Sequence, residues 1–225
     1  MRLNLRNQYF SQARYNRYLI STGHDINRAK KLYLANIRLA QAFHPILSQF
    51  EVVLRNSLND QLSTHFANQN WIKTEKNGFM NDPSLGQRPY LKGQILSSER
   101  RMRRNHITIT SGKLIADQTL GFWIALFSTP HYKLLLGKPI QILPNKPSIE
   151  NRASFHQKLQ KIRHFRNRVN HCEPLCFSGN IIDCSEAIII RTLILDLASW
   201  INPGIKPFFA KLDNVHNKIN YIMTI

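Results

Sequence analysis

Acidic residues are scarce in this sequence of 225 residues. There are 13 Asp and Glu residues against 31 Lys and Arg, which gives a formal net charge of +18 at pH 7 with histidine counted as neutral. A basic surplus of this size is typical of proteins that bind a polyanion, such as a nucleic acid, an anionic membrane surface or an acidic protein. Hydrophobic residues still make up 43% of the chain, so it can bury a core and is not a disordered basic tail.

Cysteine, glycine and proline are also few. Cys172, Cys176 and Cys184 are an odd number in a long chain, so we expect reduced thiols rather than a disulfide framework. Together with His171 they resemble a zinc site in composition, but C-x3-C-x7-C is not the spacing of a common zinc finger. We therefore predict no metal site and no cofactor. Nine glycines and ten prolines exclude collagen-like and low-complexity chains.

Long hydrophobic runs are missing too. Leu120–Phe127 is too short to span a bilayer, and Ala187–Ile201 is interrupted by Arg191 and Asp196. Residues 1–20 carry four arginines but no apolar segment of a secretory signal. We therefore expect a soluble, cytoplasmic protein with no membrane partner.

The sequence shows neither convincing strand alternation nor a glycine-rich phosphate loop, and its hydrophobic periodicity is helical almost throughout. Turn residues concentrate in two connections, 68–92 and 130–147. Helices are expected at 26–43, from Pro45 past Leu58, at 117–128, from an N-cap at Ser148 to about 172, at 183–200 and at 206–221. The helix over 183–200 is apolar on nearly every side, so we expect it at the centre of a bundle. The sequence thus predicts a single all-α domain over residues 1–225 with a loop-rich insertion.

The segment 163–174 holds the main candidate functional residues. At 100° per residue, one apolar stripe is formed by Phe155, Leu159, Ile162, Phe165 and Val169. His164, Asn167 and His171 gather on the opposite face, whereas Arg166 lies at the edge of the stripe, about 140° from His171. Arg166 and His171 can cooperate if the helix ends near His171, if the arginine curls around it, or if two protomers pair their motifs across a two-fold axis. We favour the paired arrangement.

A solvated basic helix face, with His171 near the helix C-terminus, is the simplest explanation of this segment. However, R-N-x-x-x-H directly followed by C-E-P, at Arg166–Pro174, resembles the signature of HEPN domains, specifically of the abortive-infection (Abi) AbiD/AbiF-like family. Glu51–Arg55 is similar to the E-x3-[KR] pattern on an early helix of many HEPN proteins, and Leu120–Phe127 to the aromatic helix between the two motifs. The likeness covers about residues 25–200, but only Arg166–Pro174 is specific. Cys172 departs from the family, which often has a second histidine there.

The resemblance implies an HEPN-like helical bundle that forms a two-fold homodimer and cleaves RNA without a metal. RNA carries its own nucleophile, the 2′-hydroxyl, so cleavage needs a base, an acid and positive charge near the phosphate. Histidine suits either proton transfer, and arginine supplies fixed charge and paired donors. Arg166 and His171 are accordingly the catalytic candidates, and Asn167 would orient the imidazole or hold a phosphate. The products would be a 2′,3′-cyclic phosphate and a 5′-hydroxyl.

Other residues are candidates for supporting roles. Glu51 and Arg55 have the spacing of an ordinary surface ion pair, and a position beside the cleft is the functional alternative. Trp71, Phe79 and Tyr90 could stack on bases or pack in the core. Arginines expected to track the RNA backbone are Arg100, Arg101, Arg103, Arg104, Arg163 and Arg168.

The leading hypothesis is therefore an HEPN endoribonuclease that acts as a toxin or antiphage effector. The resemblance further suggests restraint by an antitoxin or a regulatory small RNA. The alternative is a non-catalytic HEPN module that binds RNA or DNA, which shares the charge but does not need His171. A weaker third hypothesis is a membrane-surface protein, although the chain lacks a strong basic amphipathic segment with exposed bulky apolar residues.

Overall fold

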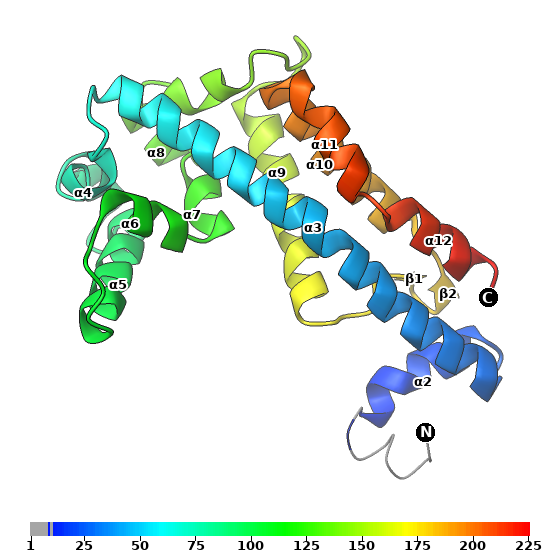
Figure 1. The fold of residues 1–225 in the computed structure, drawn as a ribbon. Coiled ribbons are helices and arrows are strands. Elements are labelled where there is room, and N and C mark those ends of the chain that lie inside the picture. Colours follow the sequence, from blue (N-terminus) through cyan, green and yellow to red (C-terminus); the bar gives the residue numbers. More distant parts are fainter. Residues whose placement is uncertain (1–8, 10) are drawn as a thin grey trace. The chain divides into compact units, whose positions relative to one another are not determined.

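The computed structural model describes residue 9 and residues 11–225, and helices dominate this part of the chain (Figure 1). The all-α fold class predicted from the sequence is thus confirmed. Its α-helices are α2 (Gln12–Ser21), α3 (Ile26–His65), α4 (Trp71–Thr74), α5 (Tyr90–Arg104), α6 (Ser111–Asp117), α7 (Leu120–Ala125), α8 (Thr129–Leu134), α9 (Arg152–Asn170), α10 (Ser185–Ile201), α11 (Lys206–Leu212) and α12 (Val215–Met223). Four 3-10 helices accompany them: η1 (Phe79–Asn81), η2 (Pro83–Leu85), η3 (Lys138–Ile142) and η4 (Pro203–Ile205).

Two very short strands form an antiparallel hairpin between α9 and α10. In this hairpin Phe177 pairs with Ile182 and Ser178 pairs with Ile181, as β1 (Phe177–Ser178) and β2 (Ile181–Ile182). Within the described residues, no helix is long and apolar enough to cross a membrane. The prediction that residues 1–20 hold no secretory signal falls partly on residues outside the described ones.

The chain divides into two compact units. Unit 1 comprises the described residues up to Ser48, together with His164–Leu195 and Pro207–Ile225, and unit 2 comprises Gln49–Arg163 and Asp196–Lys206. The unit boundaries fall inside α3, α9, α10 and α11. The single domain expected from the sequence stays a prediction.

Helix α3 runs unbroken through Pro45, so the prediction that a separate helix begins there is wrong. A proline inside a helix removes one backbone donor and crowds the preceding turn, at a cost of about 3 kcal/mol. Pro45 is exposed, and the Ser48 hydroxyl donates to the carbonyl oxygen of His44 at 2.8 Å. The buried stripe continues in phase on both sides of the proline: Leu39, Phe43, Leu47, Phe50, Leu54 and Leu58. Because this continuous burial outweighs the local cost, the helix does not break.

Helix α9 begins at Arg152, so the N-cap predicted at Ser148 is also wrong. The side-chain oxygen of Asn151 accepts hydrogen bonds from the backbone N–H groups of Ala153 (2.9 Å) and Ser154 (3.1 Å), and Asn151 is therefore the cap. Ser148 lies instead in a turn that precedes this cap.

The core stripe predicted for α9 is confirmed, because each of its members is buried: Phe155, Leu159, Ile162, Phe165 and Val169. His164 and Asn167 are exposed on the other side, and Arg166 is half-buried, as expected for the edge of the stripe. The helix therefore presents the candidate residues to solvent while its apolar face anchors it.

Several predicted elements differ from the observed ones. The connection 68–92 contains α4, η1 and η2, and the connection 130–147 contains α8 and η3. The last predicted helix is two helices, α11 and α12, because Asp213 interrupts it and accepts a hydrogen bond from the N–H of Val215 (3.0 Å). Helix α10 is not buried all round: Ile188 and Ile189 are 46% and 58% exposed.

Candidate functional site

Helix α9 ends at the candidate histidine in a Schellman turn. The Cys172 N–H donates to the carbonyl of Val169 (3.1 Å) and the Glu173 N–H to that of Arg168 (2.9 Å), which are the two hydrogen bonds of this motif. Cys172 adopts the left-handed conformation that glycine usually supplies (φ 51°). His171 is therefore the C-cap residue, and one of the three arrangements left open by the sequence, a helix ending near His171, is present.

The C-cap position keeps His171 close to Asn167 and in contact with solvent. The His171 N–H donates to the Asn167 carbonyl at 2.9 Å, so the two residues lie one helical turn apart. Both are exposed, whereas Arg166 is half-buried. The end of α9 thus combines an accessible imidazole, an accessible amide and a partly buried guanidinium.

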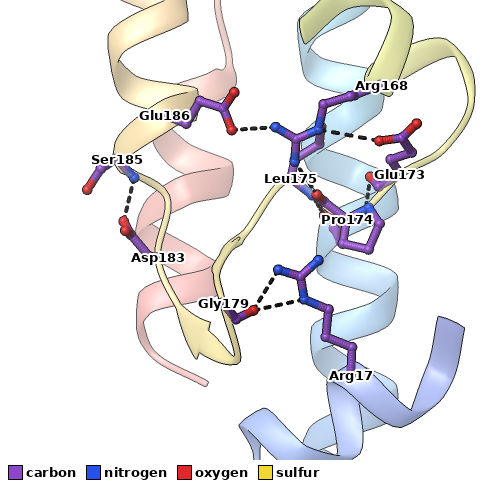
Figure 2. A network of polar contacts seen from close by, with 10 residues as sticks. Arg17, Arg168, Glu173, Pro174, Leu175, Gly179, Asp183, Ser185 and Glu186 are labelled. Carbon is purple, nitrogen blue, oxygen red and sulfur yellow. Dashed lines mark hydrogen bonds and ion pairs between the residues drawn. The ribbon is translucent and has the colours of Figure 1, made fainter. Parts of the chain in front are cut away.

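Arg168 fastens the loop that follows His171 (Figure 2). Its guanidinium donates to the carbonyl of Pro174 (2.6 Å), forms an ion pair with Glu186 at the start of α10, and lies 3.5 Å from the carboxylate of Glu173. The sequence placed Arg168 among the RNA-binding residues, but its donors are directed at the protein itself. Its role in the structure is to hold the loop between α9 and α10.

Asn36 of α3 holds the same loop from its buried side. It is 2% exposed; its amide donates to the carbonyl of Glu173 (3.3 Å) and its oxygen accepts from the N–H of Leu175 (2.6 Å). A buried amide that satisfies two loop backbone groups fixes their position, because leaving them unpaired would be costly. Sequence reasoning missed Asn36, although a polar residue on the buried stripe of α3 was an available signal.

Two arginines of α2 also reach this loop. Arg14 donates to the carbonyl of His171 at 3.4 Å, and Arg17 donates twice to the carbonyl of Gly179, at 3.0 and 2.6 Å. The Arg17 guanidinium also lies 4.9 Å from the ring centroid of Phe177, a cation–π contact. These contacts link residues more than 150 positions apart, so no local pattern could have revealed them.

The predicted supporting pair, Glu51 and Arg55, lies on the part of α3 that belongs to unit 2. Both residues are half-buried, and Arg55 reaches the carbonyl of Ala116 at 3.5 Å. Because the residues at the end of α9 belong to unit 1, the supporting role of Glu51 and Arg55 stays a prediction.

The basic cluster in the last turns of α5 is only partly available to a ligand. Arg101 forms an ion pair with Asp117 and holds the pKa of that carboxyl below its usual range. Arg103 lies 3.4 Å from the carboxylate of Glu99, which Lys76 contacts at 2.7 Å. Arg101 and Arg103 therefore have acidic partners within the fold.

Three of the predicted α5 arginines meet around one surface hollow. It has a volume of about 370 Å³ and is lined by Ser97, Arg100, Arg101 and Arg104. Arg163, another predicted RNA-binding residue, is exposed on α9, and its donor reaches the side chain of Gln160 at 3.4 Å. Of the predicted backbone-binding arginines, the structure thus brings Arg100, Arg101 and Arg104 together and places Arg103 outside the hollow.

The three aromatic candidates for base stacking differ in their exposure to solvent. Trp71 is fully buried and donates to the side chain of Asn59 (3.0 Å), and Phe79 is half-buried against Phe66, so both belong to the packing of unit 2. Tyr90 is 44% exposed. Tyr90 is therefore the most exposed of the three aromatic residues, and its role in base stacking stays a prediction.

The cysteines are free thiols in different environments. Burial raises the pKa of Cys176 to about 12 and that of Cys184 to about 11, which keeps both protonated and unreactive. Cys172 is exposed in the Schellman turn. Across residue 9 and residues 11–225, no three His, Cys, Asp or Glu side chains gather in a group that could hold a metal.

Comparison of the chain with models of protein families, with curated proteins and with solved structures gave no match in any of the three. The HEPN resemblance therefore rests on the Arg166–Pro174 motif, and its functional consequences are proposals.

Proposed function

We propose that the protein is a metal-independent endoribonuclease of the HEPN type, acting as a toxin or antiphage effector in the cytoplasm. The observation that carries this proposal is the end of α9, where exposed His171 caps the helix one turn after Asn167. The loop beyond His171 is fastened by Asn36 and Arg168. A catalytic group on a fixed backbone needs little reorganisation when substrate binds.

The chemistry follows from the groups at this helix end. The imidazole of His171 takes the proton of the RNA 2′-hydroxyl, and the freed oxygen attacks the adjacent phosphorus. The guanidinium of Arg166 stabilises the negative charge that develops on the phosphoryl oxygens. The bond from phosphorus to the 5′-oxygen then breaks, and that oxygen takes a proton from a second acid. The products are a 2′,3′-cyclic phosphate and a 5′-hydroxyl.

The second acid suggests a homodimer. One imidazole cannot accept the first proton and donate the second in a single concerted step. A two-fold interface would supply a second His171 to the same phosphodiester. We include in the proposal an antitoxin or small RNA that restrains the enzyme, a partner that the family resemblance suggests.

The deciding experiment is cleavage of a mixed RNA by the full chain in EDTA. Wild type is expected to produce fragments with cyclic phosphate ends, and His171→Ala and Arg166→Ala are expected to be inactive. His164→Ala is the matched control, because His164 is exposed on the same helix and lies outside the motif. Full activity in both motif variants would refute the site, and a strict requirement for a divalent metal would refute the mechanism.

A non-catalytic RNA- or DNA-binding module is the second candidate. It is favoured by the arginine hollow on α5, which belongs to unit 2 and does not include the motif residues. Salt-dependent binding that survives His171→Ala, together with intact RNA after long incubation, would support this alternative.

A further inference from the structure

Helix α5 carries a second hollow beside the arginine hollow. It has a volume of about 570 Å³, and its lining includes Arg88, Tyr90, Gln94, Leu96, Ser97 and Arg100. The arginine hollow shares Ser97 and Arg100 with it. The two hollows therefore adjoin along Ser97 and Arg100, and together they form what we call the α5 groove. All of its residues belong to unit 2.

The sequence of α5 explains why a groove forms here. The helix buries one face, which consists of Leu91, Ile95, Ser98, Glu99 and Met102. Gly93 and Ser97 lie one turn apart toward the solvent side. Gly93 has no side chain and that of Ser97 is small, so they leave a depression. Added side-chain bulk at Gly93 would meet nothing within 4 Å. Long side chains at Arg100 and Arg104, further along the same side, form the wall of this depression.

The groove is lined by five cationic side chains: Arg88, Lys92, Arg100, Arg101 and Arg104. Arg101 shares its charge with Asp117, whereas Arg100 donates to a neutral acceptor, the carbonyl of Leu96 at 3.4 Å. Within the described part of the chain, neither Arg100 nor Arg104 has a carboxylate within 4 Å. Two uncompensated guanidinium groups beside one hollow favour a phosphate or another anion.

The rest of the groove selects among anionic ligands. From Tyr90 to Arg104 the helix rises by about 21 Å, far more than one free phosphate would occupy. Tyr90 offers an exposed aromatic ring at one end, and the amide of Gln94 offers donors and acceptors to a base edge. A base can stack on this ring only when it is not stacked within a duplex.

We propose that the α5 groove binds single-stranded RNA, with backbone phosphates on Arg100 and Arg104 and a base stacked on Tyr90. The choice of RNA over single-stranded DNA rests on the proposed function. Because Ser97 is small and stacking accepts any base, the groove tolerates many sequences. It serves as a holding site for RNA in unit 2, separate from the residues that act on the phosphodiester in unit 1.

The test measures binding without cleavage. The full chain is titrated against a short, fluorescent 2′-O-methyl RNA, which has no free 2′-hydroxyl nucleophile, and the association constant K is determined by anisotropy at several salt concentrations. Arg100→Ala and Arg104→Ala are each expected to lower the slope of log K against log salt by about 0.7. Tyr90→Leu is expected to weaken binding roughly ten-fold and to leave the slope unchanged.

Arg103→Ala is the matched control. It removes the same charge from the same helix, but Arg103 lies outside both hollows and its partner Glu99 keeps Lys76. It should leave affinity and slope close to those of wild type. The proposal that the groove binds single-stranded RNA would be overturned if Arg103→Ala reduced affinity and slope as much as Arg104→Ala. It would also be overturned if a duplex bound as tightly as the single strand, or if Tyr90→Leu left affinity unchanged.

The result of this binding test can be distinguished from the result of the cleavage test of the proposed ribonuclease. If the groove variants behave as expected but wild type leaves RNA intact, the α5 groove stands and the proposed ribonuclease fails. If wild type cleaves RNA but the groove variants bind RNA with the same affinity and salt dependence as Arg103→Ala, the proposed ribonuclease stands and the groove proposal fails.

Discussion

Arginines surround both the loop after His171 in unit 1 and the α5 groove in unit 2, but the two sets of arginines have different partners. In unit 1, Arg17 and Arg168 direct their donors at carbonyl oxygens and carboxylates of the protein. In the groove, Arg100 and Arg104 have no acidic partner among the described residues and border open space. The net charge of the chain does not distinguish these cases; the partner of each guanidinium does.

The largest expected difference between the two regions is in their contribution to RNA cleavage. His171→Ala should reduce RNA cleavage by about 10²–10⁴-fold, because it removes a general acid–base group. Binding of uncleavable RNA should change little, because His171 does not line the α5 groove. The measurement pairs single-turnover cleavage with anisotropy. A parallel loss of binding and cleavage would show that the two regions are not separate in function.

Arg168→Ala should lower the free energy of unfolding by about 1.5–3 kcal/mol, since charged hydrogen bonds to the Pro174 carbonyl and Glu186 are lost. Arg104→Ala removes the same charge in the groove and should leave stability within about 0.5 kcal/mol of wild type. Urea unfolding followed by circular dichroism compares the two. Equal destabilisation by the two substitutions would contradict the view that Arg168 holds the loop in place whereas Arg104 has no structural partner in the described chain.

Asn36→Leu should cost about 1–3 kcal/mol, because it leaves the Leu175 N–H and the Glu173 carbonyl without their partner. Asn36→Asp is the informative companion. It keeps the oxygen that accepts from Leu175, but it replaces the donor to Glu173 with a buried carboxylate that faces a carbonyl oxygen. At pH 7 it should therefore cost at least as much as Asn36→Leu, and the cost should fall when acid protonates the carboxyl. If the loop positions His171, both variants should also slow cleavage, with groove binding unaffected.

The two units should also respond differently to acid. In unit 2, burial lowers the pKa of His131, whose ring nitrogen lies 2.8 Å from the Ser128 hydroxyl, and that of His156. Their neutral forms therefore stabilise the fold above the unfolded-state pKa of about 6.5, and this contribution is lost as pH falls through the lower folded-state pKa. The loop after His171 in unit 1 is held instead by the contacts of Arg17 and Arg168.

Hydrogen exchange at pH 7 and pH 5 would measure this difference. Protection should fall around His131 before it falls in the loop after His171. His131→Gln should flatten the pH dependence by at most about 1.4 kcal/mol per pH unit, and His164→Gln, at an exposed site, serves as the control. Earlier loss of protection in the loop would contradict the prediction.

The smallest expected effect is at Cys172. Its left-handed backbone (φ 51°) favours glycine, so Cys172→Gly should stabilise the protein by up to about 1 kcal/mol. Cleavage should be unchanged, because the Schellman hydrogen bonds come from the backbone. Thermal unfolding of the two proteins checks this, and Cys172→Val should shift the melting temperature in the opposite direction.

Sequence reasoning succeeded where local periodicity decides the structure. The stripe of α9 and the accessible face with Asn167 follow from the helical repeat, and the stop before Pro174 follows from proline chemistry. It failed at Pro45, where a local rule predicted a break and burial along α3 on both sides kept the helix continuous. The prediction that Arg168 binds RNA stays a prediction. Its partner Glu186 lies on another helix, so no local pattern indicates this ion pair.

The contacts of α2 also matter for when the loop can be completed during synthesis. Arg17 is added to the growing chain 162 residues before its acceptor Gly179. At ribosomal rates that interval is roughly 8–32 s, during which α2 has no hairpin to bind. A nascent or truncated chain therefore lacks the finished loop until most of the protein has been synthesised, so any activity that depends on this loop starts only late in synthesis.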